Sequence, residues 1–409
     1  MLPDPGQSTL STARRWRIAL YSHDTMGLGH KRRNLLIAQT LGTALNADIL
    51  LISGMRDAST VATPPGVDYL ALPALYKRAD GTYEARHLGL SLAELVGLRS
   101  QLIRTAIKSF QPDVLIVDNV PRGAVRELDP TLEYVKSQPH IRCILGLRDV
   151  LDTPEAVRRD WQQADNETAI RRYYTAVWIY GDASLYDPRV EYGFAPDIVA
   201  KMTPLGYLDQ RPRLAHASPH SRDRIAALTA TDESFVACFV GGGQDGAALA
   251  AAFTQVTFAP QTRGILVTGP LMPPEVRQRL HRRATKNPRL RVMEYLEEPT
   301  LLLERASRAI AMGGYNTTCE VLSFQTPALI VPRVSPRQEQ WIRAERLQKR
   351  GLVDILHPSQ VSPAALTTWL QQPLSPVASQ PINLNGLENL LSEVHRLLLT
   401  DPLASSQAS

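Results

Sequence analysis

The stretch of residues 308–351 constrains the fold more than any other part of the chain. Apolar residues 309–311 run into the pair Gly313-Gly314, a helical pattern follows, and the apolar run 328–331 is typical of a buried parallel strand. We expect Asn316 or Thr317 to cap the helix, with Glu320 one turn later. Two interpretations stay open for this stretch alone. Either a ligand approaches the glycine pair and faces Glu320, or the unit is an ordinary βαβ turn with a solvated glutamate.

The same alternation of apolar runs and amphipathic segments fills most of the chain. Apolar runs typical of strands lie at residues 16–22, 47–53, 67–73, 112–118, 141–149 and 177–182, and again at 234–240, 263–269 and 290–296. Helical patterns separate most of them. Repeated units of this kind predict mostly parallel sheets covered by helices on both faces. We therefore expect an α/β protein with two doubly wound, Rossmann-like domains.

Length and composition suggest where these domains begin and end. A chain of 409 residues exceeds the size of one hydrophobic core, so two domains are expected. The stretch 206–221 is rich in Pro, His and Arg and has no periodicity, which indicates a linker. We expect a disordered N-terminus at 1–14, a first domain at 15–207, a linker at 208–225, a second domain at 226–372, a break and a C-terminal helix at 373–400, and a disordered tail at 401–409.

The charge balance is mildly basic, with 45 Lys+Arg, 40 Asp+Glu and a net charge of +5. This suits an anionic ligand or an anionic membrane surface and does not require nucleic acid. The three cysteines lie far apart and outside any Cys/His cluster, so we expect neither a zinc site nor a disulfide framework, and a cytoplasmic location. No signal peptide or apolar run of ~18 residues is visible, whereas peripheral contact with a membrane stays open.

Each half of the chain opens with a glycine loop between a strand and a helix. The first spans residues 23–33 and the second residues 239–249. Neither is a GxGxxG fingerprint or a P-loop, so a dinucleotide site is weakly supported. A single glycine loop can be a mere tight turn. Two such loops, one heading each domain, favour a ligand held between helix N-termini at the carboxyl ends of the strands.

His30 closes the first loop and is our first candidate for a general base. A capping or core histidine is the alternative role, and His23 competes as the base. Asp118 ends a predicted strand, so it would lie at the edge of the cleft, where it could orient His30 or contact a hydroxyl. It could equally cap a helix or stabilise a turn. No DxD motif follows a strand, so we expect no metal and no cofactor.

Several motifs resemble those of the GT-B glycosyltransferases: SHDTMGLGHKRRN, PDVLIVD, GGYNTTCEVLSF, PALIVPR and EQWIRAERL. The nearest resemblance is to family 28, which includes the N-acetylglucosaminyltransferase that makes the lipid-linked peptidoglycan precursor. A bacterial subgroup of predicted glycosyltransferases is closest. The resemblance covers residues 16–356 and implies two domains facing a central cleft.

The resemblance also implies roles for single residues. The second domain would bind the nucleotide-sugar donor, with Glu320 accepting from the ribose hydroxyls and with Glu339 and Gln340 at the donor sugar or its phosphates. The first domain would bind the acceptor, and His30 matches the histidine that ends the family's first loop. The residues that would lie near the nucleotide or its diphosphate are Gly27, Gly29, Gly241, Gly242, Gly243, Gln244, Gly313, Gly314, Asn316 and Thr317.

This sequence departs from the family pattern in two places. Family 28 usually has GGTGGHxxP where this chain has MGLGHKRR, and the Gln-Gln pair of the peptidoglycan enzyme is Glu339-Gln340 here. These changes concern a lipid-linked acceptor more than the donor. We expect an inverting, metal-independent transfer from a nucleotide-diphosphate sugar, UDP-linked, to a small-molecule, glycan or lipid-linked acceptor. The alternatives are a nucleotide-sugar 2-epimerase and a non-catalytic nucleotide-sugar-binding regulator.

Overall fold

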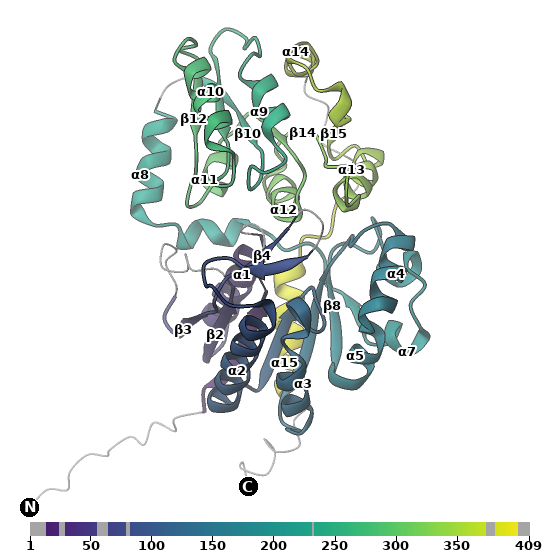
Figure 1. Cartoon of the computed structure of the whole chain (residues 1–409). Coiled ribbons are helices and arrows are strands. Elements are labelled where there is room, and N and C mark those ends of the chain that lie inside the picture. Colours follow the sequence, from purple (N-terminus) through teal and green to yellow (C-terminus); the bar gives the residue numbers. More distant parts are fainter. Residues whose placement is uncertain are drawn as a thin grey trace, which may run out of the picture.

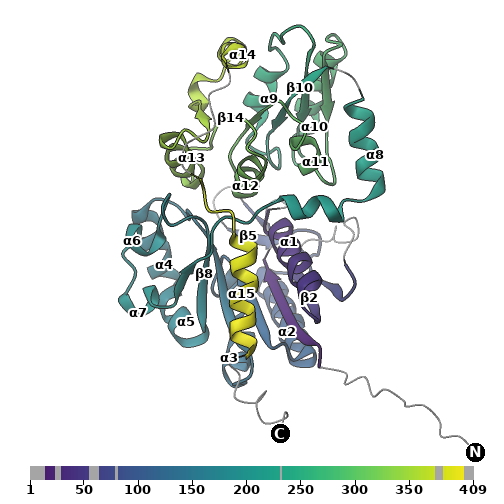
Figure 2. The same ribbon diagram turned by 180° about the vertical axis from the view of Figure 1, so that it is seen from behind.

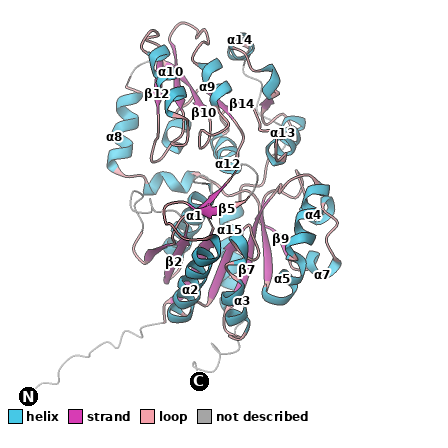
Figure 3. Ribbon diagram, viewed as in Figure 1, coloured by secondary structure: helices cyan, strands magenta, loops and turns pink. Residues whose placement is uncertain are grey.

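The computed structural model describes residues 14–23, 29–54, 64–78, 82–230, 233–373 and 381–399. Two α/β domains lie one above the other, each a parallel sheet between layers of helices (Figures 1 and 3). The predicted fold class is thereby confirmed. The predicted N-terminal and C-terminal disorder lies outside the described residues.

The first sheet has seven parallel strands in the order β3-β2-β1-β6-β7-β8-β9. All residues of β6 and β8 are buried, as expected for strands covered on both faces. From β1, the order runs to β2 and β3 on one side and to β6 on the other, so the crevice between β1 and β6 is the switch point where ligands bind in such sheets. The strands are β1 (Trp16–Ser22), β2 (Ala47–Ser53), β3 (Val67–Ala71), β6 (Val114–Asp118), β7 (Arg142–Arg148), β8 (Ala176–Tyr180) and β9 (Met202–Pro204).

Alternate residues of each strand pack against opposite helix layers. Ile18 and Leu20 of β1 join the core of α1, whereas Ala19 and Tyr21 join the core of α2 and α3. The helical pattern between the apolar runs 141–149 and 177–182 forms two helices, because Asp165 adopts a left-handed backbone conformation between them. The helices are α1 (Gly29–Ala44), α2 (Leu92–Phe110), α3 (Asp129–Lys136), α4 (Pro154–Ala164), α5 (Asn166–Tyr173), α6 (Pro188–Glu191) and α7 (Pro196–Val199); β4 (Leu75–Lys77) and β5 (Tyr83–Ala85) form a hairpin.

The second sheet has six parallel strands in the order β12-β11-β10-β13-β14-β15, with its switch point between β10 and β13. The glycine loops that follow β10 and β13 therefore lie side by side at one edge. The strands are β10 (Ser234–Phe239), β11 (Thr262–Val267), β12 (Leu290–Met293), β13 (Arg308–Ala311), β14 (Ala328–Ile330) and β15 (Asp354–Ile355). The helices are α8 (Pro219–Leu228), α9 (Ala247–Phe253), α10 (Pro274–Ala284), α11 (Thr300–Leu303), α12 (Tyr315–Phe324), α13 (Glu339–Lys349) and α14 (Pro363–Gln371).

The chain crosses between the domains twice, and the two crossing segments run together. Helix α15 (Gly386–Leu399) returns to the first domain and packs beside α1 (Figure 2). The amide of Tyr207 donates to the Asn383 carbonyl at 2.8 Å, and Leu208 forms an antiparallel bridge with Asn385. The stretch expected as a linker holds the 3₁₀ helix Arg211–His216 and the start of α8, where Ser218 caps the helix.

Candidate active site between the domains

The carboxyl ends of β1 and β6 bring His30 and Asp118 together. His30 lies in the first turn of α1, and its Nδ1 is 2.6 Å from Oδ2 of the buried Asp118. Burial opposes ionisation of this carboxyl, yet the charge of Arg33 and the hydrogen bonds with His30 and Arg33 hold the pKa of Asp118 well below its ordinary range. An ionised carboxylate only accepts hydrogen bonds, so Nδ1 of His30 donates to it. The lone pair of a neutral imidazole is then on Nε2, available for a proton.

Arg33 completes this cluster from the next turn of α1. Its Nη2 donates to both oxygens of Asp118, at 2.5 and 2.7 Å, and Nη2 also lies 3.1 Å from Nδ1 of His30. The arginine therefore keeps Asp118 charged and fixed. His23, the competing base, is buried, and burial together with His30 lowers its pKa well below the ordinary value. Its Nδ1 has no hydrogen-bond partner among the residues that the structure describes.

The glycines of the second domain divide into two groups. A Cβ on Gly243 would lie 2.5 Å from the Thr268 carbonyl oxygen, and one on Gly313 would lie 2.6 Å from Ile330, so packing alone requires these two glycines. Gly241 and Gly314 have no such neighbour within 4 Å. Among the predicted site glycines that the structure describes, this second pair leaves open space beside the backbone, where a ligand could approach. Gly242 would touch Leu271 at 3.4 Å, and Gln244 is exposed.

Asn316, near the start of α12, links the second domain to the first glycine loop. Its Nδ2 donates to the carbonyl of Gly29 at 2.8 Å. The predicted capping role of Asn316 or Thr317 is wrong, because α12 begins at Tyr315, behind Gly314, and has no side-chain cap. The N-termini of α1 and α12 therefore face each other. Gly27 lies outside the described residues.

Glu320 is buried and faces an arginine of the opposite domain. Nη2 of Arg32, from α1, lies 2.9 Å from Oε1 of Glu320 and donates to Glu298 at 3.0 Å. Arg213 also pairs with Glu298, at 2.7 Å. Burial raises the pKa of Glu320 against the opposing effect of Arg32. The prediction of a solvated glutamate is thus wrong, and the carboxylate is engaged by a residue that the sequence did not single out.

Glu339 and Gln340 open α13 and bind one arginine. Arg333 donates to Oε1 of Glu339 at 2.6 Å, and its backbone amide donates to Oε1 of Gln340 at 3.0 Å. Oε2 of Glu339 is buried and has no hydrogen-bond partner in the described ranges. Further along the same helix, Arg343 binds the buried Asp149 of the first domain. The start of α13 thus lies at the domain interface with an unused carboxylate oxygen.

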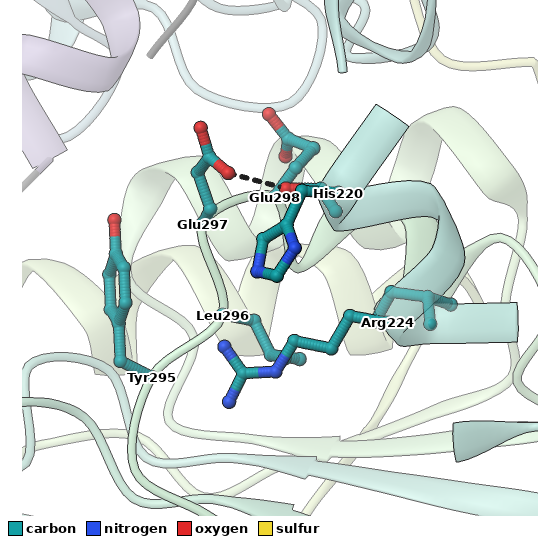
Figure 4. A pocket seen from close by; sticks show the side chains of 8 residues that line it. His220, Arg224, Tyr295, Leu296, Glu297 and Glu298 are labelled. Atoms are coloured by element: carbon teal, nitrogen blue, oxygen red, sulfur yellow. Dashed lines mark hydrogen bonds between the residues drawn. The ribbon is translucent and has the colours of Figure 1, made fainter. Parts of the chain in front are cut away.

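A cavity of about 180 Å³ lies beside the Glu320 cluster. Figure 4 shows His220 and Arg224 of α8 opposite the loop that joins β12 to α11. Glu298 lines the cavity and also binds Arg32, so the cavity and Glu320 share one ion-pair network. The lining residues are His220, Ser221, Arg224, Ile225, Tyr295, Leu296, Glu297 and Glu298.

Four charged residues of this site were not predicted from the sequence: Arg32, Arg33, Arg213 and Glu298. The basic triplet 31–33 at the start of α1 was a visible signal, but its partners lie 85 to 288 positions away, beyond the reach of local spacing. Within the described ranges, no group of three or more His, Cys, Asp or Glu residues could hold a metal ion. No helix in that part of the chain is long and apolar enough to cross a membrane.

Comparison with known proteins supports glycosyl transfer. Residues 236–382 match the glycosyltransferase family 28 C-terminal domain, which confirms the family resemblance for the second domain. No curated protein matches the sequence.

Solved structures resemble the chain over nearly its whole length, although at 16% identity or less. MurG of Acinetobacter baumannii has 12% identity and a TM-score of 0.56, over 94% of this chain and 100% of its own. The glycosyltransferase SnogD of Streptomyces nogalater has 16% identity and a TM-score of 0.54, over 95% of this chain and 96% of its own. The UDP-GlcNAc 2-epimerase of Neisseria meningitidis, bound to UDP-GlcNAc, has 12% identity and a TM-score of 0.60, over 95% of this chain and 100% of its own. Such similarity shows the fold, and the predicted GT-B architecture is confirmed.

Proposed function

We propose that this protein transfers a sugar from a nucleotide-diphosphate sugar, UDP-linked, to an acceptor hydroxyl, with inversion and without a metal. The observation that carries the proposal is that the candidate base of the first domain lies close to the candidate diphosphate site of the second domain. The His30–Asp118 pair of the first domain lies at the N-terminus of α1, and Asn316 binds that N-terminus to the glycine-flanked start of α12. The family 28 match of the second domain supports the same activity.

The donor would lie along the second domain. The N-terminus of α12 offers unpaired N–H groups to a diphosphate, and Gly314 leaves room beside them. Glu320 would accept from the ribose hydroxyls once Arg32 moves aside, and the cavity beside Glu298 would take the nucleobase. The sugar would contact Gln340 and the free Oε2 of Glu339.

The chemical step is an in-line displacement. Nε2 of His30 takes the proton of the acceptor hydroxyl while that oxygen bonds to the anomeric carbon. The bond from this carbon to the diphosphate oxygen breaks on the opposite face, so the configuration inverts. The leaving diphosphate keeps the electron pair, and its charge is stabilised by the start of α12. Asp118 orients His30 and balances the imidazolium that forms.

The test combines binding and turnover. A thermal-shift screen of the full chain with nucleoside diphosphates and their sugars should show stabilisation, largest for the uridine series. His30→Gln should lower kcat about 10²-fold to 10⁴-fold with an unchanged nucleotide Kd. His395→Gln, at an exposed position on α15, is the matched control. No response to any nucleotide would contradict the proposal.

The two alternatives have their own products. Product analysis with the donor alone separates an epimerase, which returns the epimerised sugar, from a transferase, which gives slow hydrolysis or no change. A regulator would bind the donor and turn over no acceptor of a broad panel.

A further inference from the structure

Arg148 lies near Glu339 and Arg343 of the second domain and, within the described part of the chain, forms no ion pair with a carboxylate. It ends β7, next to the strand that Asp118 ends. Its one side-chain hydrogen bond among the described residues is a long contact of 3.4 Å from Nε to Oδ1 of Asn119. The acidic groups of this region are already paired: Asp118 with Arg33 at 2.5 Å, Asp149 with Arg343 at 2.7 Å, and Glu339 with Arg333 at 2.6 Å.

Among the described charged groups around Arg148, this arrangement leaves one positive charge in excess. Arg148 is only partly exposed, and Arg33, Arg343, Asp118 and Glu339 are the charged groups that act on it. Burial, then Arg33 and Arg343, lower the pKa of Arg148, whereas the pKa values of Arg33 and Arg343 are raised by their own carboxylates. Burial of a guanidinium group beside two others costs free energy unless an anion pairs with it. A bidentate carboxylate or phosphate would do so.

We propose that Arg148 binds a carboxylate or phosphate group of the acceptor, so that the acceptor is an anionic hydroxyl compound. The inference rests on the proposed function and names its substrate class. Arg148 belongs to the first domain and lies at the same sheet edge as His30 and Asp118, where the acceptor hydroxyl must be deprotonated. The N-terminus of α12, by contrast, belongs to the other domain and would hold the donor diphosphate.

The test uses inorganic phosphate as the anion probe on the full chain saturated with UDP. Saturation keeps the probe out of the diphosphate site. Phosphate should raise the melting temperature of the wild type, and Arg148→Gln should weaken phosphate binding about 10-fold to 100-fold, as expected for lost charge-assisted hydrogen bonds. Arg104→Gln, at an exposed position on α2, should bind phosphate like the wild type. Arg148→Lys keeps the charge and should bind with intermediate affinity, which covers the case that the glutamine variant does not fold.

A turnover arm compares two acceptors that differ in charge, 4-hydroxybenzoate and its methyl ester. The wild type should prefer the carboxylate, and Arg148→Gln should lose the preference while the KM for the donor stays the same. Equal phosphate binding by wild type and variant, or no phosphate binding by the wild type, would overturn the inference. Competition between phosphate and UDP, together with a raised donor KM in the variant, would also overturn the inference. Arg148 would then bind the donor diphosphate and not the acceptor. A wild type that binds phosphate through Arg148 but no nucleotide would instead contradict the proposed function.

Discussion

The ion pair between Arg343 and Asp149 offers the sharpest test of how the two domains are held together. Arg343, on α13, donates to Asp149 of the first domain at 2.7, 2.8 and 3.1 Å, and Tyr207 donates to the same carboxylate at 2.6 Å. The two charged side chains are 1% and 0% exposed. Asp149 raises the pKa of Arg343 despite its burial, so the arginine is charged.

Arg343→Met should destabilise the protein strongly, because it leaves a buried carboxylate without its cation. Removal of one partner of a buried pair costs about 3–5 kcal/mol. Arg346→Met is the matched control on the same helix, since Arg346 also reaches the first domain, at Glu191, but these side chains are 41% and 29% exposed. An exposed pair contributes less than about 1 kcal/mol.

Urea unfolding followed by circular dichroism measures both effects. The double variant Asp149→Asn/Arg343→Met should recover most of the loss, because the remaining amide can still accept from Tyr207 and no charge stays buried. If Arg343→Met costs no more than Arg346→Met, burial at this interface does not govern the strength of its ion pairs, and the reasoning is refuted.

Three further predictions concern the site. Asp118→Asn should lower kcat about 10²-fold or more with normal nucleotide affinity, since the amide no longer fixes the proton of His30 on Nδ1; an unchanged kcat would remove His30–Asp118 from the mechanism. Burial alone would raise the pKa of Glu298, but Arg213 and Arg32 lower it to about 2, so its contribution of about 3 kcal/mol is present above pH 4.5 and lost as the pH falls toward 2. The Glu298→Gln variant should therefore show a flatter decline of melting temperature over this range, and an equal slope would contradict the assignment. Gly314→Ala should weaken nucleotide binding without changing the melting temperature, whereas Gly243→Ala, at φ +98° and against the Thr268 carbonyl, should lower the melting temperature; the reverse pattern would contradict the division of the glycines.

Much of the fold could be predicted because buried parallel strands are continuous apolar runs. The strand at β9 was missed, since three residues ending in a proline at a sheet edge give no such run. The break at Asp165 was missed because a left-handed residue leaves the helical periodicity on both sides intact. The meeting of His30 and Asp118 could be expected because His30 closes the loop after the first strand and Asp118 ends another strand, whereas their catalytic roles stay predictions.

The contacts of Glu320 and Asn316 could not be predicted in the same way. Both side chains bind the other domain, at Arg32 and at Gly29, and a pattern within one helix carries no information on a partner nearly 290 residues away. The resemblance to family 28 implies a role toward the donor for each residue. The structure adds that each also contacts the other domain, so a nucleotide that binds at Glu320, as proposed, would replace an interdomain contact.

The path of the chain has a mechanical consequence. Because α15 returns to the first domain, Trp16 and Leu399 both belong to that domain, and the second domain is an insertion carried on two paired segments. A pulling force applied at these two residues would act on the first domain directly. It would reach the second domain only after the pairing between Leu208 and Asn385 breaks. The second domain would thus stay folded while the first domain is stretched.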